Sequence, residues 1–119
     1  MIVSKRISFD AAHFLPEYEG PCVFMHGHHF SVELAVQGEV NHETGMVMDF
    51  KYLKEFLQSI KDIFDHTLLN NIISNPTAEN IALYIKEQFD TRGRYTLGDV
   101  KLAFIKVWET EDSCVEIRV

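Results

Sequence analysis

Residues 26–37 read HGHHFSVELAVQ, and this stretch decides the fold that the sequence predicts. Its even-numbered positions hold two histidines followed by four apolar residues, whereas its odd-numbered positions are mostly small or polar. Because side chains alternate between the two faces of a β-strand, this pattern predicts a strand with one apolar and one polar face, ending near Gly38. His26 and His28 both lie on the apolar face of that strand.

The same alternation recurs in part at residues 2–13, and helical spacing of apolar residues follows two capping residues, Asp49 and Thr77. The predicted elements are, in order, strands at 2–13 and 26–36, helices at 50–64 and 77–89, a loop at 91–98, and strands at 100–108 and 114–119. Strands joined by short connections favour an antiparallel four-stranded sheet with both helices on one face, an α+β fold. Such a sheet leaves two edge strands unpaired, so we expect the protein to self-associate.

Composition and charge narrow the class of protein. The chain of 119 residues is 46% hydrophobic and 24% charged, which predicts one globular domain over residues 1–119. The net charge is -7 and no basic stripe is visible, so nucleic acid is not an expected partner. No apolar run approaches the roughly 18 residues that a membrane span needs. The two cysteines, Cys22 and Cys114, make no disulfide framework, so we expect free thiols and a cytoplasmic, reducing compartment.

Three histidines are candidate metal ligands. His26 and His28 are two residues apart on one strand, so their rings point to the same face about 6.6–6.8 Å apart along the chain. His13 ends the predicted neighbouring strand on its apolar face. Three histidines and one open position are typical of a catalytic zinc site. A His-x-His pair alone is more often surface decoration, and the third ligand depends on the two strands pairing.

Two further groups carry acid–base or nucleophilic chemistry. Cys22 lies four residues before His26 in a loop rich in Pro and Gly, where a thiolate would serve as base, nucleophile or fourth metal ligand; the alternative is a small buried apolar residue. Asp65 and His66 end the first predicted helix, where the carboxylate would orient the imidazole. Adjacent residues on a regular helix do not face each other, so this pair requires the helix to end there. The alternative is a histidine that only favours the helix C-terminus.

Glu109 follows the buried parity of the third predicted strand, within the triplet Trp108-Glu109-Thr110. A partly buried carboxylate needs a partner. The guanidine-like edge of a pterin or guanine would supply two N–H donors to it. The alternative is a carboxylate at a strand end in water.

These residues fall within six short blocks: FDAAH at 9–13, CVFMHGH at 22–28, TGMVMDF at 44–50, DH at 65–66, NPTAEN at 75–80 and WET at 108–110. In this order, and over nearly the whole chain, they resemble the 6-pyruvoyl-tetrahydropterin synthase family. The Cys-x-x-x-His-Gly-His spacing is most similar to the 6-carboxy-5,6,7,8-tetrahydropterin synthase branch of queuosine biosynthesis. Another branch has Glu near the cysteine position, and Cys22 argues against it. His29 stands where the family more often has Asn.

The resemblance implies the tunnelling fold, ββααββ, in which three subunits pair their sheets into a barrel and two trimers stack into a hexamer. It implies a site shared between subunits, with Zn2+ as cofactor. The roles that it assigns are metal ligation by His13, His26 and His28, proton acceptance by Cys22, proton relay by His66 with Asp65, and pterin binding by Glu109 and Thr77.

The implied activity is that of a zinc-dependent lyase. It would convert 7,8-dihydroneopterin triphosphate to 6-carboxy-5,6,7,8-tetrahydropterin, with release of acetaldehyde and triphosphate. One alternative is triphosphate elimination without carbon–carbon cleavage, as in 6-pyruvoyl-tetrahydropterin synthase. Others are a non-catalytic zinc- or purine-binding module on the same scaffold, and a structural oligomer in which the histidines only pack.

Overall fold

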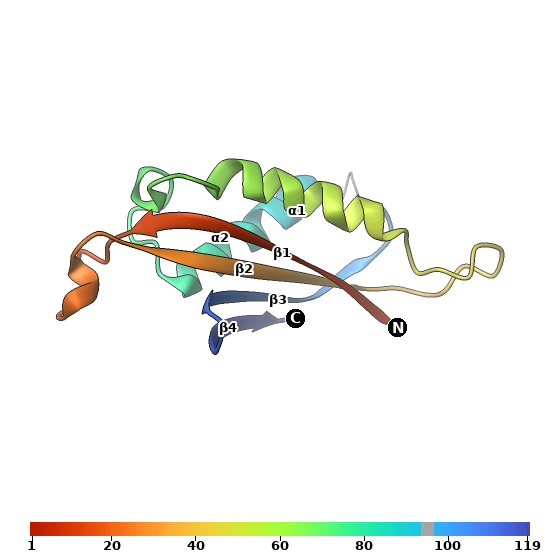
Figure 1. The fold of residues 1–119 in the computed structure, drawn as a ribbon. Helices are drawn as coiled ribbons and strands as arrows, with labels where there is room; N and C mark the ends of the chain where they lie inside the picture. Colours follow the sequence, from red (N-terminus) through yellow and green to blue (C-terminus); the bar gives the residue numbers. More distant parts are fainter. Residues whose placement is uncertain (94–96) are drawn as a thin grey trace.

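The computed structural model describes residues 1–93 and 97–119, which form a four-stranded antiparallel sheet with two α-helices on one face (Figure 1). The strands lie in the order β1-β2-β3-β4. The elements are β1 (Ile2–His13), η1 (Pro21–Val23), β2 (His26–Gln37), α1 (Phe50–Phe64), η2 (Leu69–Asn71), α2 (Ala78–Gln88), η3 (Phe89–Gly93), β3 (Lys101–Thr110) and β4 (Ser113–Arg118). The predicted α+β fold and the order of its elements are confirmed.

The β1–β2 pair positions the candidate metal ligands. All 12 residues of β1 pair with β2, and no bulge interrupts this ladder. Residues of one parity therefore stay on one face along the whole length of both strands. On the face that the helices cover, Phe9 stacks on Phe30 with ring centroids 5.3 Å apart. At the end of the same ladder, the register places His13 directly opposite His26.

The two helices cover the apolar face of the sheet. α1 begins after Asp49, whose carboxylate accepts a hydrogen bond from the Lys51 backbone N–H at 2.9 Å, as expected of an N-cap. α1 packs on β1, whereas α2 packs on β3 and β4. The residues that α1 buries recur every three or four positions, and they are Leu53, Phe56, Leu57, Ile60 and Phe64. The last of these residues, Phe64, also contacts the Phe9 ring, with centroids 5.5 Å apart, toward the histidine-bearing end of β1.

The opposite face of the sheet is covered by no helix in the part of the chain that the structure describes (Figure 1). The Arg6 guanidinium lies there over the Trp108 ring, 3.8 Å from its centroid. The Ser8 and Ser31 hydroxyls share a hydrogen bond of 2.9 Å across β1 and β2. β1 and β4 are the two edges of this open sheet.

Some boundaries differ from the prediction. α2 ends at Gln88 and continues as the π-helical turn η3, so part of the loop predicted at 91–98 is helical, while residues 94–96 of that loop lie outside the described residues. β3 extends to Thr110, with a register shift between Trp108 and Thr110. No helix among the described residues is long and apolar enough to cross a membrane.

Candidate metal centre

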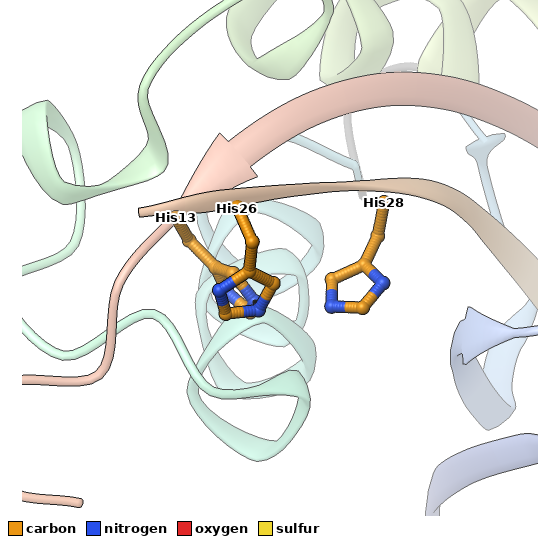
Figure 2. A group of neighbouring side chains, drawn as sticks. All are labelled: His13, His26 and His28. Carbon is orange, nitrogen blue, oxygen red and sulfur yellow. Dashed lines mark hydrogen bonds between the residues drawn. The ribbon is translucent and has the colours of Figure 1, made fainter. Parts of the chain in front are cut away.

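The three candidate ligands lie close together at the end of the β1–β2 ladder, on the apolar face of the sheet (Figure 2). They are His13, His26 and His28. Each offers one ring nitrogen, and these three atoms lie within 4.8 Å of one another. The centroid of the His13 ring lies 4.6 Å from that of the His26 ring and 5.2 Å from that of the His28 ring. The His13 and Phe30 rings are nearly perpendicular, with centroids 5.6 Å apart, so the cluster borders an apolar side chain. We call these three residues the histidine cluster.

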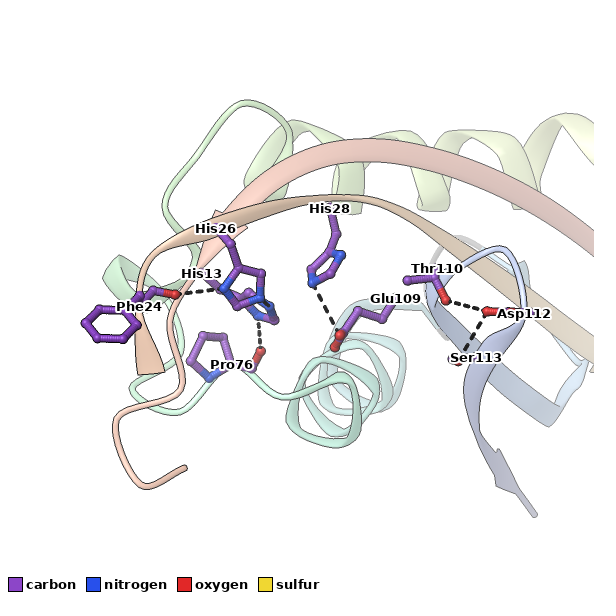
Figure 3. A network of polar contacts seen from close by, with 9 residues as sticks. All are labelled: His13, Phe24, His26, His28, Pro76, Glu109, Thr110, Asp112 and Ser113. Atoms are coloured by element: carbon purple, nitrogen blue, oxygen red, sulfur yellow. Dashed lines mark hydrogen bonds and ion pairs between the residues drawn. The ribbon is translucent and has the colours of Figure 1, made fainter. Parts of the chain in front are cut away.

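Main-chain carbonyl groups fix the tautomers of two of the rings (Figure 3). His13 Nδ1 donates to the Pro76 carbonyl oxygen at 2.8 Å, and His26 Nδ1 donates to the Phe24 carbonyl oxygen at 2.8 Å. Because a carbonyl only accepts, both Nδ1 atoms carry the hydrogen. In the neutral rings, both Nε2 atoms are then lone-pair donors to a metal, with the second nitrogen held as metal-ligating histidines usually hold it.

The two Nε2 atoms lie 3.0 Å apart, so two lone pairs face each other at contact distance. Neither neutral ring has a hydrogen left to place between them. A cation between the rings removes this repulsion. Two nitrogens at about 2.0–2.1 Å from one tetrahedral zinc ion lie roughly 3.3 Å apart, close to the observed separation. The residues present therefore fit a metal ion.

His28 completes the cluster. Its Nε2 atom is buried and has no hydrogen-bond partner among the described residues. Glu109 Oε1 lies 3.3 Å from this atom, within ion-pair distance but outside hydrogen-bond geometry. Burial lowers the pKa of the His28 ring, the Glu109 carboxylate opposes this, and the other two rings of the cluster add to it. The net lowering favours the neutral ring, which is the form that binds metals.

Glu109 reaches the cluster because of the irregular end of β3. The register shift leaves this residue without a partner on β4. Its side chain lies on the same face as Ile105 and Val107 and is 29% exposed. The sequence-based expectation of a partly buried carboxylate is thus confirmed, and the structure adds that it contacts a histidine of the cluster (Figure 3).

Asp65 and His66 form a second polar group, at the end of α1. The helix ends at Phe64, and His66 has a φ of 58°, in the left-handed region. This turn brings His66 Nδ1 within 3.0 Å of Asp65 Oδ2, so the two adjacent side chains do meet. The Asp10 backbone N–H donates to Asp65 Oδ1 at 3.0 Å, and the His66 N–H donates to the Asp10 carbonyl at 2.7 Å.

These contacts also set the charge of the pair. The hydrogen bond from the Asp10 backbone lowers the pKa of Asp65, and His66 and Lys61 lower it further. The carboxylate is therefore ionised throughout the neutral range. Since it holds the Nδ1–H of His66, the Nε2 atom is left to face outward on a ring whose side chain is 80% exposed.

Cys22 and Thr77 lie on the segments that flank the cluster. Cys22 is half-buried in η1, where the Leu15 N–H donates to its carbonyl oxygen at 2.8 Å. Its sulfur is not part of the histidine cluster. Thr77 caps α2 as predicted, since its hydroxyl accepts from the Asn80 N–H at 3.1 Å. In the described part of the chain, no hydrogen bond or ion pair joins Cys22 or His66 to the cluster.

The sequence reasoning missed the two carbonyl acceptors, Pro76 and Phe24. A backbone oxygen has no residue-type signal, although Pro76 lies in the quoted block NPTAEN and Phe24 in CVFMHGH. His29, which stands where the family more often has Asn, is exposed, and its Nδ1 pairs with Asp10 Oδ1 at 2.7 Å on the face opposite the histidine cluster.

The fold and the cluster define an α+β protein with three histidines placed to hold a metal ion at one end of an antiparallel sheet. Residues 2–119 match the model of the 6-pyruvoyl tetrahydropterin synthase family, and the chain belongs to this family.

Curated relatives agree with this membership, and a solved structure shares the fold. The chain is 42% identical over 118 residues to a putative 6-carboxy-5,6,7,8-tetrahydropterin synthase of Archaeoglobus fulgidus, covering 99% of this chain and 96% of that protein. It is 44% identical over 116 residues to a dihydroneopterin monophosphate aldolase of Pyrococcus furiosus, covering 95% and 93%. The structure of Caenorhabditis elegans 6-pyruvoyl tetrahydropterin synthase matches with a TM-score of 0.84 at 24% identity, covering 100% of this chain and 95% of that one.

Proposed function

We propose that the protein is a zinc-dependent lyase that converts 7,8-dihydroneopterin triphosphate and water to 6-carboxy-5,6,7,8-tetrahydropterin, acetaldehyde and triphosphate. The observation that carries the proposal is the histidine cluster, in which two rings hold their Nδ1–H on carbonyls and direct Nε2 to one point. The relative in Archaeoglobus fulgidus supports the choice of reaction. Bound at the cluster, zinc would polarise the side-chain hydroxyls of the substrate as a Lewis acid and acidify the neighbouring C–H bond.

The side chains of the protein transfer the protons and bind the pterin ring. Cys22 Sγ takes a proton from the substrate side chain, and His66 Nε2 transfers the second proton. Asp65 keeps the hydrogen of His66 on Nδ1, as the observed 3.0 Å contact favours. The Glu109 carboxylate accepts hydrogen bonds from the N–H groups of the pterin ring. Thr77 lies at the pterin, where its hydroxyl hydrogen is free to donate because its oxygen only accepts from Asn80.

We infer that the site is shared between copies of the chain. Cys22 and the Asp65–His66 pair lie on separate segments with no bond between them in the described residues. β1 and β4 are open edges that a second copy can extend. The proposed assembly is a hexamer, formed by two stacked trimers whose sheets close into barrels, and the proposed setting is queuosine biosynthesis in the cytoplasm.

The test is a product analysis. The zinc-loaded protein is incubated with 7,8-dihydroneopterin triphosphate, and the pterins are identified by mass spectrometry. The expected products are 6-carboxy-5,6,7,8-tetrahydropterin and an equal amount of acetaldehyde. A 6-pyruvoyl product without acetaldehyde would assign the chain to the elimination reaction instead, and unchanged substrate would leave a binding module.

A second candidate is cleavage of dihydroneopterin monophosphate, as in the 44% identical protein of Pyrococcus furiosus that is named for this activity. Both candidates break a carbon–carbon bond of the pterin side chain, so the same residues serve both. The two substrates are compared at equal concentrations of enzyme, and kcat/KM is measured for each. A higher kcat/KM for the monophosphate would favour the aldolase.

A further inference from the structure

A small basic cavity lies between β1 and α1, apart from the histidine cluster. It has a volume of about 160 Å³. Its lining consists of Lys5, Arg6 and Ile7 from β1, and Lys54, Leu57, Gln58 and Lys61 from α1. We call it the lysine cavity. Positions 57, 58 and 61 follow position 54 by three, four and seven residues, so all four share one face of the helix.

The charge of the cavity is unbalanced. Its lining contains no Asp or Glu. In the part of the chain that the structure describes, Lys5, Lys54 and Lys61 take part in no ion pair. Gln58 is held by Asp62, to which its amide donates at 2.9 Å. The Arg6 guanidinium lies over Trp108 on the other face of the sheet. Three lysines and one arginine therefore line a single cavity whose lining has no acidic side chain.

This basic lining contrasts with the molecule as a whole, whose net charge is -7. The cavity has an apolar floor, since Leu57 is fully buried and Ile7 is partly buried. Charges beside apolar surface are screened less than charges in open water, so the mutual repulsion of the lysines is stronger there. A multivalent anion in the cavity relieves this repulsion and takes hydrogen bonds from the ammonium groups.

We propose that the lysine cavity binds a phosphate-class anion, either inorganic phosphate and short polyphosphates or the phosphate tail of a larger ligand. Lysine ammonium groups bind phosphate as point charges with three donors each, which suits a tetrahedral oxyanion better than a planar carboxylate. Lys61 also acts on Asp65 electrostatically, so a charge bound here is felt at the Asp65–His66 pair. Binding of the free anion does not depend on the proposed enzymatic activity.

The test is isothermal titration calorimetry of the purified protein with inorganic phosphate and with pyrophosphate. In the Lys5→Gln/Lys54→Gln double variant, we expect the affinity for pyrophosphate to fall by about tenfold or more, because two charge-assisted hydrogen bonds are lost. Lys51→Gln is the matched control. Lys51 lies on the same helix, outside the cavity lining, and its removal leaves the affinity unchanged.

Two further variants separate the alternatives. His26→Ala keeps pyrophosphate binding if the anion lies in the lysine cavity, and loses it if the anion binds a metal at the histidine cluster. Equal affinities in wild type and the double variant overturn the proposal. A change of oligomeric state in the double variant, without a change in anion affinity, also overturns it and identifies the cavity as a contact between copies.

The source of the phosphate is distinguished by kinetics. If the cavity takes the tail of the pterin substrate, the double variant raises KM for the phosphorylated substrate with little change in kcat. If it takes a free anion, KM is unchanged and pyrophosphate binding alone is weakened. This arm rests on the proposed function, whereas the calorimetry does not, so the two can fail separately.

Discussion

At the scale of single residues, the orientation of each imidazole matters more than its presence. His13 and His26 each use one nitrogen to donate to a carbonyl and turn the other toward a common point. The ring of His29 is close in sequence but points to the other face, where it pairs with Asp10. On β2, strand parity alone therefore separates the candidate ligands His26 and His28 from His29.

This separation predicts the effect of removing single histidines. His26→Ala takes away one of three ligands, so we expect the metal content to fall from about one ion per chain to a small fraction of that. His29→Ala is the control and keeps its metal. Elemental analysis of the purified proteins measures both. Full metal content in His26→Ala would refute the assignment of the ligands.

The hydrogen bonds of Asp65 predict a dependence on pH. Its pKa is lower in the folded protein than in the unfolded chain, so the ionised carboxylate stabilises the folded state above the unfolded-state pKa of about 3.9. That stabilisation is lost as the pH falls through the folded-state pKa. Urea unfolding of wild type and Asp65→Asn between pH 7 and pH 3 measures it. The difference in unfolding free energy should be constant near neutrality and shrink below about pH 4. A difference that grows in acid would contradict the assignment.

At the scale of elements, the end of α1 combines a structural cost with a chemical use. His66 has a φ of 58°, which disfavours any residue with a Cβ atom. Its backbone is nevertheless held there by the hydrogen bond to the Asp10 carbonyl. A glycine would relieve the strain at this position, yet a glycine has no imidazole.

We therefore expect His66→Gly to be more stable than His66→Ala by about 1 kcal/mol, since both lack the ring and only glycine tolerates this φ. Both variants should lose turnover by a similar factor, about 100-fold or more, if His66 transfers a proton. Thermal or urea unfolding measures the first effect and steady-state kinetics the second. Equal stabilities would show that the backbone relaxes away from the left-handed region.

The same element shows what a sequence can and cannot predict. Apolar periodicity places α1 and the β1–β2 pair correctly, because burial on one face demands it. The sequence predicts that Asp65 and His66 can pair where α1 ends, but it does not predict the left-handed φ of His66 that brings the two side chains together, because this residue is not a glycine. The contact between Glu109 and His28 depends on a register shift in β3, which alternation cannot reveal. The carbonyl partners of the histidine cluster are invisible for the same reason.

At the scale of the whole molecule, the sheet is open at both edges and bare on one face in the described residues. Exposed apolar side chains add to this, with Phe24 and Met25 both more than half exposed beside the histidine cluster. Open edges and exposed apolar surface both favour association with further copies.

A shared site predicts complementation between two inactive variants. Cys22→Ala should abolish turnover while keeping its zinc, and His66→Ala should also be inactive. If Cys22 and His66 of one site come from different copies, mixed assemblies of the two variants regain about a quarter of the wild-type activity, because a quarter of the sites then hold both residues. Kinetics of co-expressed, tandem-purified assemblies measure this. Inactive mixed assemblies would place both residues of a site on one chain.

The pairing of His13 with His26 has a consequence for how the molecule holds itself together. These two residues flank the connection between β1 and β2, residues 14–25, which is far too long for a tight hairpin turn. A metal ion bound to both rings would cross-link the two strand ends and close this loop. It would fix the register of the strands, as a disulfide bond does in an oxidising compartment. Removal of the metal with a chelator should therefore destabilise this end of the sheet first. Hydrogen–deuterium exchange should then speed up at the β1–β2 amides nearest His13 and His26, while the amides beneath α1 stay protected.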